Sequence, residues 1–254
     1  MPSKQSKHAP KHPTQPMFEV SVEQITKAEI RMMSTIEDAM HTIAFMTEYC
    51  REHGDNDLKE LTIADAFACL GGNTLSFCRT FKHVRAYEIV KDRFAKLQDY
   101  TAAFENILLF NQNCRHDNGI LDSRFPRDVI FLDPPWENPE THEVDDSVFT
   151  DAIDMCNQIS QQTTTKYVFM KLPLQLSDKV DNRANFKYLT EQMNDDWTDI
   201  RIQPLLRWKN TRYEETYTIV CACRKQKPIE DTPAMTTEAP SVQLLLMQLA
   251  NLHA

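Results

Sequence analysis

The sequence predicts an α/β fold in which a doubly wound, seven-stranded sheet ends in an antiparallel hairpin and is preceded by an N-terminal helical extension. Three observations lead to this prediction. Between residues 61 and 193, short apolar runs alternate with segments of helical periodicity, the pattern of a parallel sheet covered by helices on both faces. Two longer runs follow across a turn of about four residues, which is typical of a hairpin. A length of 254 residues suits one sizeable domain with appendages.

The first 16 residues have the composition of a disordered segment. Residues 1–16 contain Lys4, Lys7 and Lys11 with four prolines, and no acid precedes Glu19. Such a composition cannot bury enough apolar surface to fold. We expect a basic arm there, either touching RNA phosphates, serving as a targeting signal, or simply remaining a solvated tail.

Residues 17–57 are expected to form the helical extension. Ser21 and Gln24 match a capping box, which predicts that a long helix begins there and continues to about Arg51. Gly54 then ends the helix. The apolar stripe that predicts this helix and packs on the core consists of Ile25, Met32 or Met33, Ile36, Met40, Ile43, and Met46 or Thr47.

The core, residues 58–225, contains the alternating elements, and residues 226–254 follow it. The expected strands are 61–65, 84–88, 107–110, 129–132, 167–172, 200–208 and 213–223, and the expected helices are 73–81, 91–104, 148–160 and 185–193. Three prolines between residues 226 and 240 indicate a linker. An apolar run over 242–252 predicts a short C-terminal helix that docks on the domain or on a protein partner.

Two short motifs follow two of the expected strands. The first strand leads into Asp65-Ala-Phe-Ala-Cys-Leu-Gly-Gly-Asn-Thr, and the fourth leads into Asp133-Pro-Pro-Trp. A strand that ends in a tight glycine turn and opens a helix builds a nucleotide-type pocket at the carboxyl edge of a parallel sheet. The second motif adds a hydrogen-bond acceptor and a flat ring beside that pocket. Together they predict a methyltransferase that uses S-adenosyl-L-methionine and modifies an exocyclic amine.

The first motif and the next two strand ends supply the predicted cofactor site. Asp65 can accept from the cofactor's amino group, and the backbone of Gly71 and Gly72 can approach closely because no Cβ intervenes. Glu88 can accept the ribose hydroxyls, unless it is a plain surface acid. Asn113 can pair with the adenine edge, unless it is a turn residue. The predicted cofactor residues are Asp65, Phe67, Gly71, Gly72, Asn73, Thr74, Glu88 and Asn113.

The second motif supplies the predicted catalytic residues, Asp133, Pro134, Pro135 and Trp136. An aryl amine is a poor nucleophile because its lone pair is delocalised into the ring. Accepting both N–H bonds, with the Asp133 carboxylate and the Pro134 carbonyl, aims the lone pair, so catalysis is mostly positioning and charge stabilisation. Two prolines make the turn rigid, and Trp136 offers a face for purine stacking. The alternative is a proline turn in an ordinary loop.

Charge limits how the protein can meet nucleic acid. The net charge of −9 argues against coating nucleic acid by bulk electrostatics. The acids that follow Trp136 would attract a cationic 7-methylguanine cap base, or else form a mobile solvated loop. These acids are Glu137, Glu140, Glu143, Asp145, Asp146, Asp151 and Asp154. Besides the basic arm, the residues expected to meet phosphates are Lys171, Arg207, Lys209 and Arg212.

Cysteine usage and hydropathy bear on compartment. Seven cysteines without a Cys-x-x-Cys pair indicate buried thiols in a reducing intracellular compartment, the cytoplasm or nucleus. The same spacing predicts no metal site. No apolar run approaches the roughly 20 residues of a membrane span, so no membrane association is expected.

The first motif resembles that of the trimethylguanosine synthase family, Asp-Ala-Phe-Cys-Gly-x-Gly-Gly-Asn-Thr. Those enzymes transfer methyl groups to N2 of a 7-methylguanosine RNA cap. Phe18-Glu-Val-Ser-Val-Glu-Gln-Ile is similar to their Phe-Ser-Val-Thr-Pro-Glu-x-Ile segment, and the resemblance extends patchily over residues 17–224. It implies the Rossmann-like fold of class I methyltransferases, cofactor roles for Asp65, Glu88 and Asn113, and a cap base stacked on Trp136.

The sequence departs from that family at two motif positions. Cys69 replaces the first motif glycine, and Asp133 stands where the family usually has serine. Aspartate at that position is similar to the N6-adenine enzymes and to some guanine-N2 rRNA enzymes. The mRNA adenosine methyltransferases share Asp-Pro-Pro-Trp but carry it before the cofactor motif. Three hypotheses follow: a guanine-N2 methyltransferase of capped RNA, an N6-adenine methyltransferase of RNA or DNA, and a catalytically silent methyltransferase-fold subunit that binds RNA or a partner enzyme.

Overall fold

The computed structural model contains two compact units that divide after Arg224, and the first unit is described here. The basic arm, the capping box at Ser21, the acids from Glu137 to Asp146, and the linker and terminal helix expected after residue 225 lie outside the described residues. The structure describes residues 33–116, 119–136, 147–173, 175–177, 180–181, 183–209 and 212–225.

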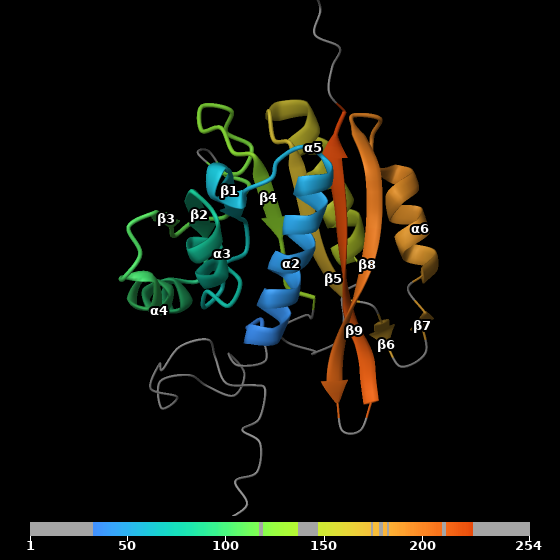
Figure 1. Ribbon diagram of the computed structural model, residues 1–254, viewed down its shortest axis with the longest axis horizontal. Helices are drawn as coiled ribbons and strands as arrows, with labels where there is room; N and C mark the ends of the chain where they lie inside the picture. Colours follow the sequence, from blue (N-terminus) through green and yellow to red (C-terminus); the bar gives the residue numbers. More distant parts are fainter. Residues whose placement is uncertain are drawn as a thin grey trace, which may run out of the picture. The chain divides into compact units, whose positions relative to one another are not determined.

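Seven strands form one sheet in the order β3-β2-β1-β4-β5-β9-β8 (Figure 1). Strands β1 to β5 pair in parallel, whereas β9 is antiparallel to both β5 and β8. The predicted α/β sheet with its antiparallel hairpin is therefore confirmed. A separate pair, β6 and β7, was not predicted. The strands are β1 Thr62–Asp65, β2 His83–Tyr87, β3 Ile107–Phe110, β4 Val129–Leu132, β5 Tyr167–Pro173, β6 Gln175–Ser177, β7 Val180–Asp181, β8 Trp197–Lys209 and β9 Arg212–Arg224.

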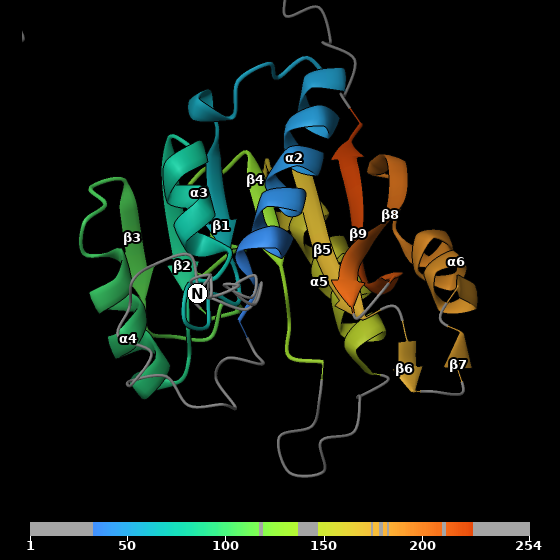
Figure 2. The same cartoon turned by 60° about the horizontal axis from the view of Figure 1, so that its bottom comes forward.

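Helices cover both faces of the sheet (Figure 2). Val129 and Phe131 of β4 pack in one core with residues of α2 and α3, whereas Ile130 and Leu132 pack in another with residues of α5 and α6. This alternation is what a fully buried parallel strand requires. In the described part of the chain, no helix has both the length and the apolar character of a membrane span. The helices are α2 Ile36–Glu52, the 3₁₀ turn η2 Leu58–Glu60, α3 Thr74–Thr80, α4 Lys91–Thr101, α5 Ser147–Gln162 and α6 Arg183–Gln192.

Helix α2 begins later than the sequence predicted. A continuous helix from Ser21 to Arg51 is wrong, because Ser34 and Thr35 are not helical. Thr35 caps α2 in a capping box: its Oγ1 accepts from the Asp38 amide at 3.2 Å, and Asp38 Oδ2 accepts from the Thr35 amide at 3.2 Å. This cap fixes where the chain enters the helix, and therefore where Ser34 lies.

The buried face of α2 also differs from the predicted stripe. Met40 is 61% exposed, and small side chains replace it in the core. The buried residues of the helix are Asp38, Ala39, Thr42, Met46, Tyr49 and Cys50. Ala39 and Thr42 allow close approach, and the larger Met46 and Tyr49 fill the interior further along, so residue size rather than hydrophobicity alone decides the packed face.

The sheet order places two strand ends beside each other at a switch point. After β1 the chain builds β2 and β3 on one side, then returns to place β4 on the other. In the register, Asp65 at the end of β1 is opposite Phe131, two positions before Asp133. Ligands of open α/β sheets bind in the crevice at such a point. Both sequence motifs therefore meet at the carboxyl edge of the sheet.

Candidate active site

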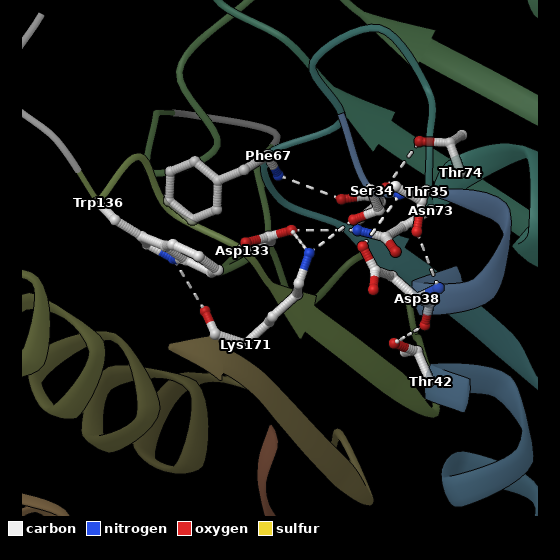
Figure 3. A network of polar contacts seen from close by, with 11 residues as sticks. Ser34, Thr35, Asp38, Thr42, Phe67, Asn73, Thr74, Asp133, Trp136 and Lys171 are labelled. Carbon is white, nitrogen blue, oxygen red and sulfur yellow. Dashed lines mark hydrogen bonds and ion pairs between the residues drawn. The ribbon is translucent and has the colours of Figure 1, made fainter. Parts of the chain in front are cut away.

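The two carboxylate oxygens of Asp133 differ in their hydrogen bonds. Its Oδ2 accepts a hydrogen bond from Asn73 Nδ2 at 3.1 Å and from Lys171 Nζ at 3.1 Å (Figure 3). No described residue donates to its Oδ1. Burial raises the pKa of Asp133, and the adjacent Lys171 ammonium opposes that rise. One oxygen is thus left for an incoming hydrogen-bond donor.

Lys171 belongs to this site and is not a surface contact for phosphates. It lies in β5, and its side chain is only 6% exposed, so the expected phosphate role is wrong. The register aligns Leu132 with Met170, which brings the next residues, Asp133 and Lys171, together. A second bond from Nζ reaches Ser34 Oγ at 2.6 Å. The sequence signal was a single lysine in the apolar run Tyr-Val-Phe-Met-Lys-Leu-Pro.

Trp136 is half-buried and tied to the same strand. Its Nε1 donates to the Lys171 carbonyl oxygen at 3.2 Å, and its ring packs against both large core clusters. The Lys171 ammonium lies 5.4 Å from its ring centroid, and the Tyr217 ring lies 6.0 Å away at an interplanar angle of 45°. The ring is therefore held in a fixed orientation, as a stacking platform requires.

The prolines of the motif differ in exposure. Pro134 is buried, while Pro135 is exposed. No described residue donates a hydrogen bond to the Pro134 carbonyl. The turn therefore leaves the two acceptors that the sequence predicts for an amine, the Pro134 carbonyl and Oδ1 of Asp133.

Asp65 and Thr74 connect the two ends of the glycine motif. Thr74 Oγ1 donates to Asp65 Oδ2 at 2.6 Å, and the Phe67 amide donates to Oδ1 at 3.3 Å. Asp65 is 1% exposed, and burial raises its pKa to about 7, with Asp133 adding to the rise and Thr74 opposing it. Each carboxylate oxygen can accept a further bond, so the predicted role toward an amino group stays open to test.

The two motif glycines are required for different reasons. Gly71 has φ +95°, a left-handed conformation that glycine adopts without cost. At Gly72, an added Cβ would lie 2.7 Å from the Ser34 carbonyl oxygen and 2.8 Å from its nitrogen. The missing side chain of Gly72 therefore admits the segment before α2, in addition to any approach by a cofactor.

Cys69, the residue that replaces the first motif glycine, has a left-handed backbone with φ 51°. Such a conformation costs a non-glycine residue roughly 1–2 kcal/mol. The turn therefore has a conformation that glycine adopts more readily than cysteine, and Cys69 adopts it at some cost in stability. Burial raises the pKa of the Cys69 thiol to about 11, against the effect of Arg93, so the thiol is neutral at physiological pH. All seven cysteines are free thiols.

The side-chain amide of Asn73 is hydrogen-bonded through its nitrogen but not through its oxygen. Its Nδ2 donates to Asp133, but its buried Oδ1 has no hydrogen-bond partner among the described residues. The residue is 8% exposed. A buried amide oxygen without a donor is costly, and a bound ligand with an N–H group would satisfy it.

Glu88 lies just past β2 and is supported from the neighbouring strand. Its Oε1 accepts from the Val90 amide at 2.7 Å, while Asn111 Nδ2 donates to the carbonyls of Glu88 at 2.8 Å and Ile89 at 3.2 Å. Glu88 is 6% exposed, which excludes a plain surface acid, and the adjacent Ile89 is 61% exposed. An acid beside an exposed apolar residue suits a ribose next to a flat base. Asn111 was not predicted, although it follows β3 directly.

Asn113 forms a local turn. Its Oδ1 accepts from the Arg115 amide at 3.0 Å, and its carbonyl accepts from the His116 amide at 3.1 Å. The turn alternative is therefore observed. Its Nδ2 has no partner among the described residues, so pairing with an adenine edge remains a prediction for that nitrogen alone.

The residues fit the predicted cofactor at three positions. Asn73 Oδ1 lacks a donor, the Asp65 oxygens have remaining acceptor capacity, and Glu88 offers a carboxylate at the end of the adjacent strand. An amino group and ribose hydroxyls are donors that match these acceptors. Gly72 does not add to this fit, because the backbone of Ser34, and not an open space for a cofactor, lies where its Cβ would be.

Comparison of the sequence with known proteins identifies a relative but no family. No protein-family model matches the sequence. The uncharacterised protein L320 of Acanthamoeba polyphaga mimivirus is 29% identical over 151 residues, 55% of this chain. The chain spans only about half of that protein, 53% of its length.

Two solved structures share the architecture. A Clostridium thermocellum protein assigned to the rRNA methylases has a TM-score of 0.52 at 11% identity, covering 72% of this chain and 97% of its own. The tRNA (m1A58) methyltransferase TrmI of Aquifex aeolicus has a TM-score of 0.51 at 14% identity, covering 77% and 71%. At such identities the likeness concerns the fold, and the chain has the Rossmann-like fold of these methyltransferases.

Proposed function

We propose that this protein is an S-adenosyl-L-methionine-dependent methyltransferase that methylates an exocyclic amine of a nucleobase in RNA. The observation that carries the proposal is the Asp133 carboxylate, whose Oδ2 is held by Asn73 and Lys171 while Oδ1 accepts from no described residue. It lies at the switch point of a methyltransferase-like sheet, bonded to Asn73, with Asp65 at the end of the adjacent strand β1 and Glu88 just past β2.

In this mechanism Oδ1 of Asp133 accepts one N–H of the amine, and the Pro134 carbonyl accepts the other. These two acceptors aim the nitrogen lone pair, and the Trp136 ring orients the base. When bound, S-adenosylmethionine supplies a methyl group: the N–C bond forms, the C–S bond breaks, the sulfur leaves as a neutral thioether, and one amine proton is released. Asp133 takes that proton at Oδ1 and passes it to solvent, a role that its raised pKa favours.

Our leading acceptor is guanine N2 of a 7-methylguanosine cap. Its support is the resemblance of the first motif to the trimethylguanosine synthases and the acids that follow Trp136 in the sequence; of these, Asp151 and Asp154 are exposed on α5. The second candidate is N6 of adenine, which Asp133 favours because the cap enzymes carry serine there. The silent-subunit hypothesis rests on Cys69 and on the net charge of −9. The left-handed backbone at Cys69, a conformation that glycine favours, counts against the first of these.

The β8–β9 hairpin is the part of the protein that we propose contacts the RNA backbone. β5 ends at Pro173 opposite Tyr217 of β9, and the hairpin continues beyond that point, past the carboxyl edge of the sheet (Figure 1). The extension carries Arg207, Lys209 and Arg212, and also Glu214 and Glu215, which are opposite Arg207 and Leu206 in the register. We propose Arg207, Lys209 and Arg212 as the residues that contact phosphates of the RNA.

Matched capped and uncapped RNAs test the acceptor. The enzyme is given each RNA with S-adenosylmethionine, and the products are digested to nucleosides for mass analysis. N2-methylated cap guanosine from capped RNA alone supports the leading acceptor. N6-methyladenine from both RNAs replaces it with the second candidate, and no methylated nucleoside from either contradicts the proposed activity.

A further inference from the structure

We propose that Lys171 is a positioning residue of this active site, whose ammonium holds Asp133 and whose backbone carbonyl holds Trp136. The inference rests on the proposed function, because it assigns a role within the same reaction. Lys171 touches neither the acceptor nor the cofactor in this account, and it acts through the two residues that do.

The ammonium of Lys171 is buried, and several groups around it compensate its charge. Lys171 is 5% exposed, and Nζ contacts Asp133 Oδ2 at 3.1 Å and Ser34 Oγ at 2.6 Å. It also lies 4.5 Å from the Tyr217 ring centroid. Burying a charge is expensive unless it is paired and hydrogen-bonded. Here an anion, a hydroxyl and an aromatic face together compensate it, in a strand where an apolar residue would otherwise serve.

The ammonium determines which oxygen of Asp133 is free. Because Lys171 and Asn73 both bond to Oδ2, the carboxylate cannot rotate without losing two hydrogen bonds, and Oδ1 stays directed away from them. Lys171 also favours the ionised carboxylate, which is the form that accepts an N–H from the amine. Without the lysine, burial and nearby acids would favour the neutral acid, which is a poorer acceptor.

The same residue orients the stacking ring. Trp136 Nε1 donates to the Lys171 carbonyl at 3.2 Å. Asp133, which binds the amine, and Trp136, which stacks on its base, are therefore both positioned by the same residue of β5. Ser34 extends this arrangement to the segment before α2, because its Oγ accepts from Nζ and its backbone fits over Gly72. A shift of Lys171 would therefore misplace both groups.

Lysine replacement with a matched control tests the proposal. Lys171→Met removes the charge and keeps an unbranched side chain, whereas Lys171→Arg keeps the charge. As the control, Lys166→Met changes a half-exposed lysine that directly precedes β5 and is paired with Asp55 and Asp128. We expect Lys171→Met to lower kcat roughly 100-fold with cofactor affinity unchanged, Lys171→Arg to recover part of that loss, and Lys166→Met to match the wild type.

Two readouts separate positioning from a structural role. The acid limb of the kcat–pH profile should move to higher pH by about 1–3 in Lys171→Met, because Asp133 loses its cation. In a double-mutant cycle, Lys171→Met should cost nothing further in an Asp133→Asn background. An unmoved acid limb, or fully additive losses, would overturn the proposal. The groups facing Asp133 are Lys171 of β5, Asp38 of α2, Asp65 of β1 and the Cys69 thiol of the glycine turn.

A measurement without turnover keeps this inference distinct from the proposed function. Wild-type protein that transfers no methyl group to any nucleic acid defeats the proposed function alone. The Asp133 carboxyl is then titrated by ¹³C NMR in wild type and in Lys171→Met, with Asp133→Asn to assign the signal. A raised pKa in the variant supports the hold of Lys171 on Asp133, and an unchanged pKa overturns it. If Lys171→Met does not fold, Ser34→Ala serves instead, with a smaller shift in the same direction.

Discussion

The Nζ atom of Lys171 lies 3.1 Å from Oδ2 of Asp133, although 38 residues separate them in the chain. The contact follows from the parallel register of β4 and β5, which pairs Leu132 with Met170. The Asp-Pro-Pro-Trp motif thus supplies only part of the candidate active site. The adjacent strand β5 supplies Lys171.

Replacing Asp133 tests the amine acceptor. Asp133→Asn keeps the shape of the side chain but puts an amide in place of the carboxylate, so methyl transfer should fall about 100-fold or more. Binding of S-adenosylhomocysteine, measured by calorimetry, should persist. Asp99→Asn, an exposed change on α4, is the control. Normal turnover in Asp133→Asn would remove the residue from the mechanism.

Trp136 should govern the affinity for the acceptor. Trp136→Ala removes the stacking surface, and the acceptor KM should rise by the equivalent of roughly 1–3 kcal/mol. Trp136→Phe keeps a ring but loses the hydrogen bond to the Lys171 carbonyl, so its KM should be intermediate. Because the ring also packs on the core, the free energy of unfolding is measured for both variants. A folded Trp136→Ala protein with an unchanged KM would refute the stacking role.

Asp65 should make stability depend on pH. Its pKa is raised from the ordinary value of 3.8 to about 7 in the folded protein. Between these values the folded state binds more protons than the unfolded state, so the contribution of Asp65 to stability falls as pH rises from about 4 to 7, by at most about 4 kcal/mol. Asp65→Asn has no proton to lose. Urea unfolding of both proteins should show the wild type losing stability relative to the variant over that window; a constant difference would contradict the raised pKa.

Cys69 should tolerate glycine better than valine. At φ 51°, glycine relieves the strain of the left-handed backbone but increases the entropy of the unfolded chain, so Cys69→Gly should stay within about 1 kcal/mol of the wild type. Cys69→Val should lose about 2 kcal/mol or more, because a β-branched residue strongly disfavours this conformation. The test is the free energy of unfolding in urea. Equal stability of the two variants would mean that the turn is not strained.

Much of the fold could be predicted because its signals are local. Alternating apolar runs identified all seven strands of the main sheet, and the turn near residue 210 identified the hairpin. The start of α2 was missed because Met33, Ile36 and Met40 continue the helical spacing across the break. The helix begins instead after the less conspicuous capping pattern of Thr35 with Asp38. The short pair β6–β7 has no apolar pattern that would distinguish it from a loop.

The site was predictable only where a single motif contains its residues. Asp65, Asn73 and Asp133 belong to recognisable turns, and the structure brings them together. Lys171 and Ser34 have no motif, and their place depends on strand register and on the path of the chain over Gly72. Such pairings are tertiary, so spacing along the sequence cannot reveal them.

Locating the transferred methyl group on the base tests the proposed methylation of an exocyclic amine most directly. The protein is incubated with S-adenosylmethionine bearing a labelled methyl group and with capped RNA, uncapped RNA or DNA, and the labelled nucleosides are fragmented by mass spectrometry. We predict label on an exocyclic amine of a nucleobase, foremost guanine N2 of the cap. Label on a ring nitrogen, a ribose oxygen or the protein, or no label on any acceptor, would contradict it.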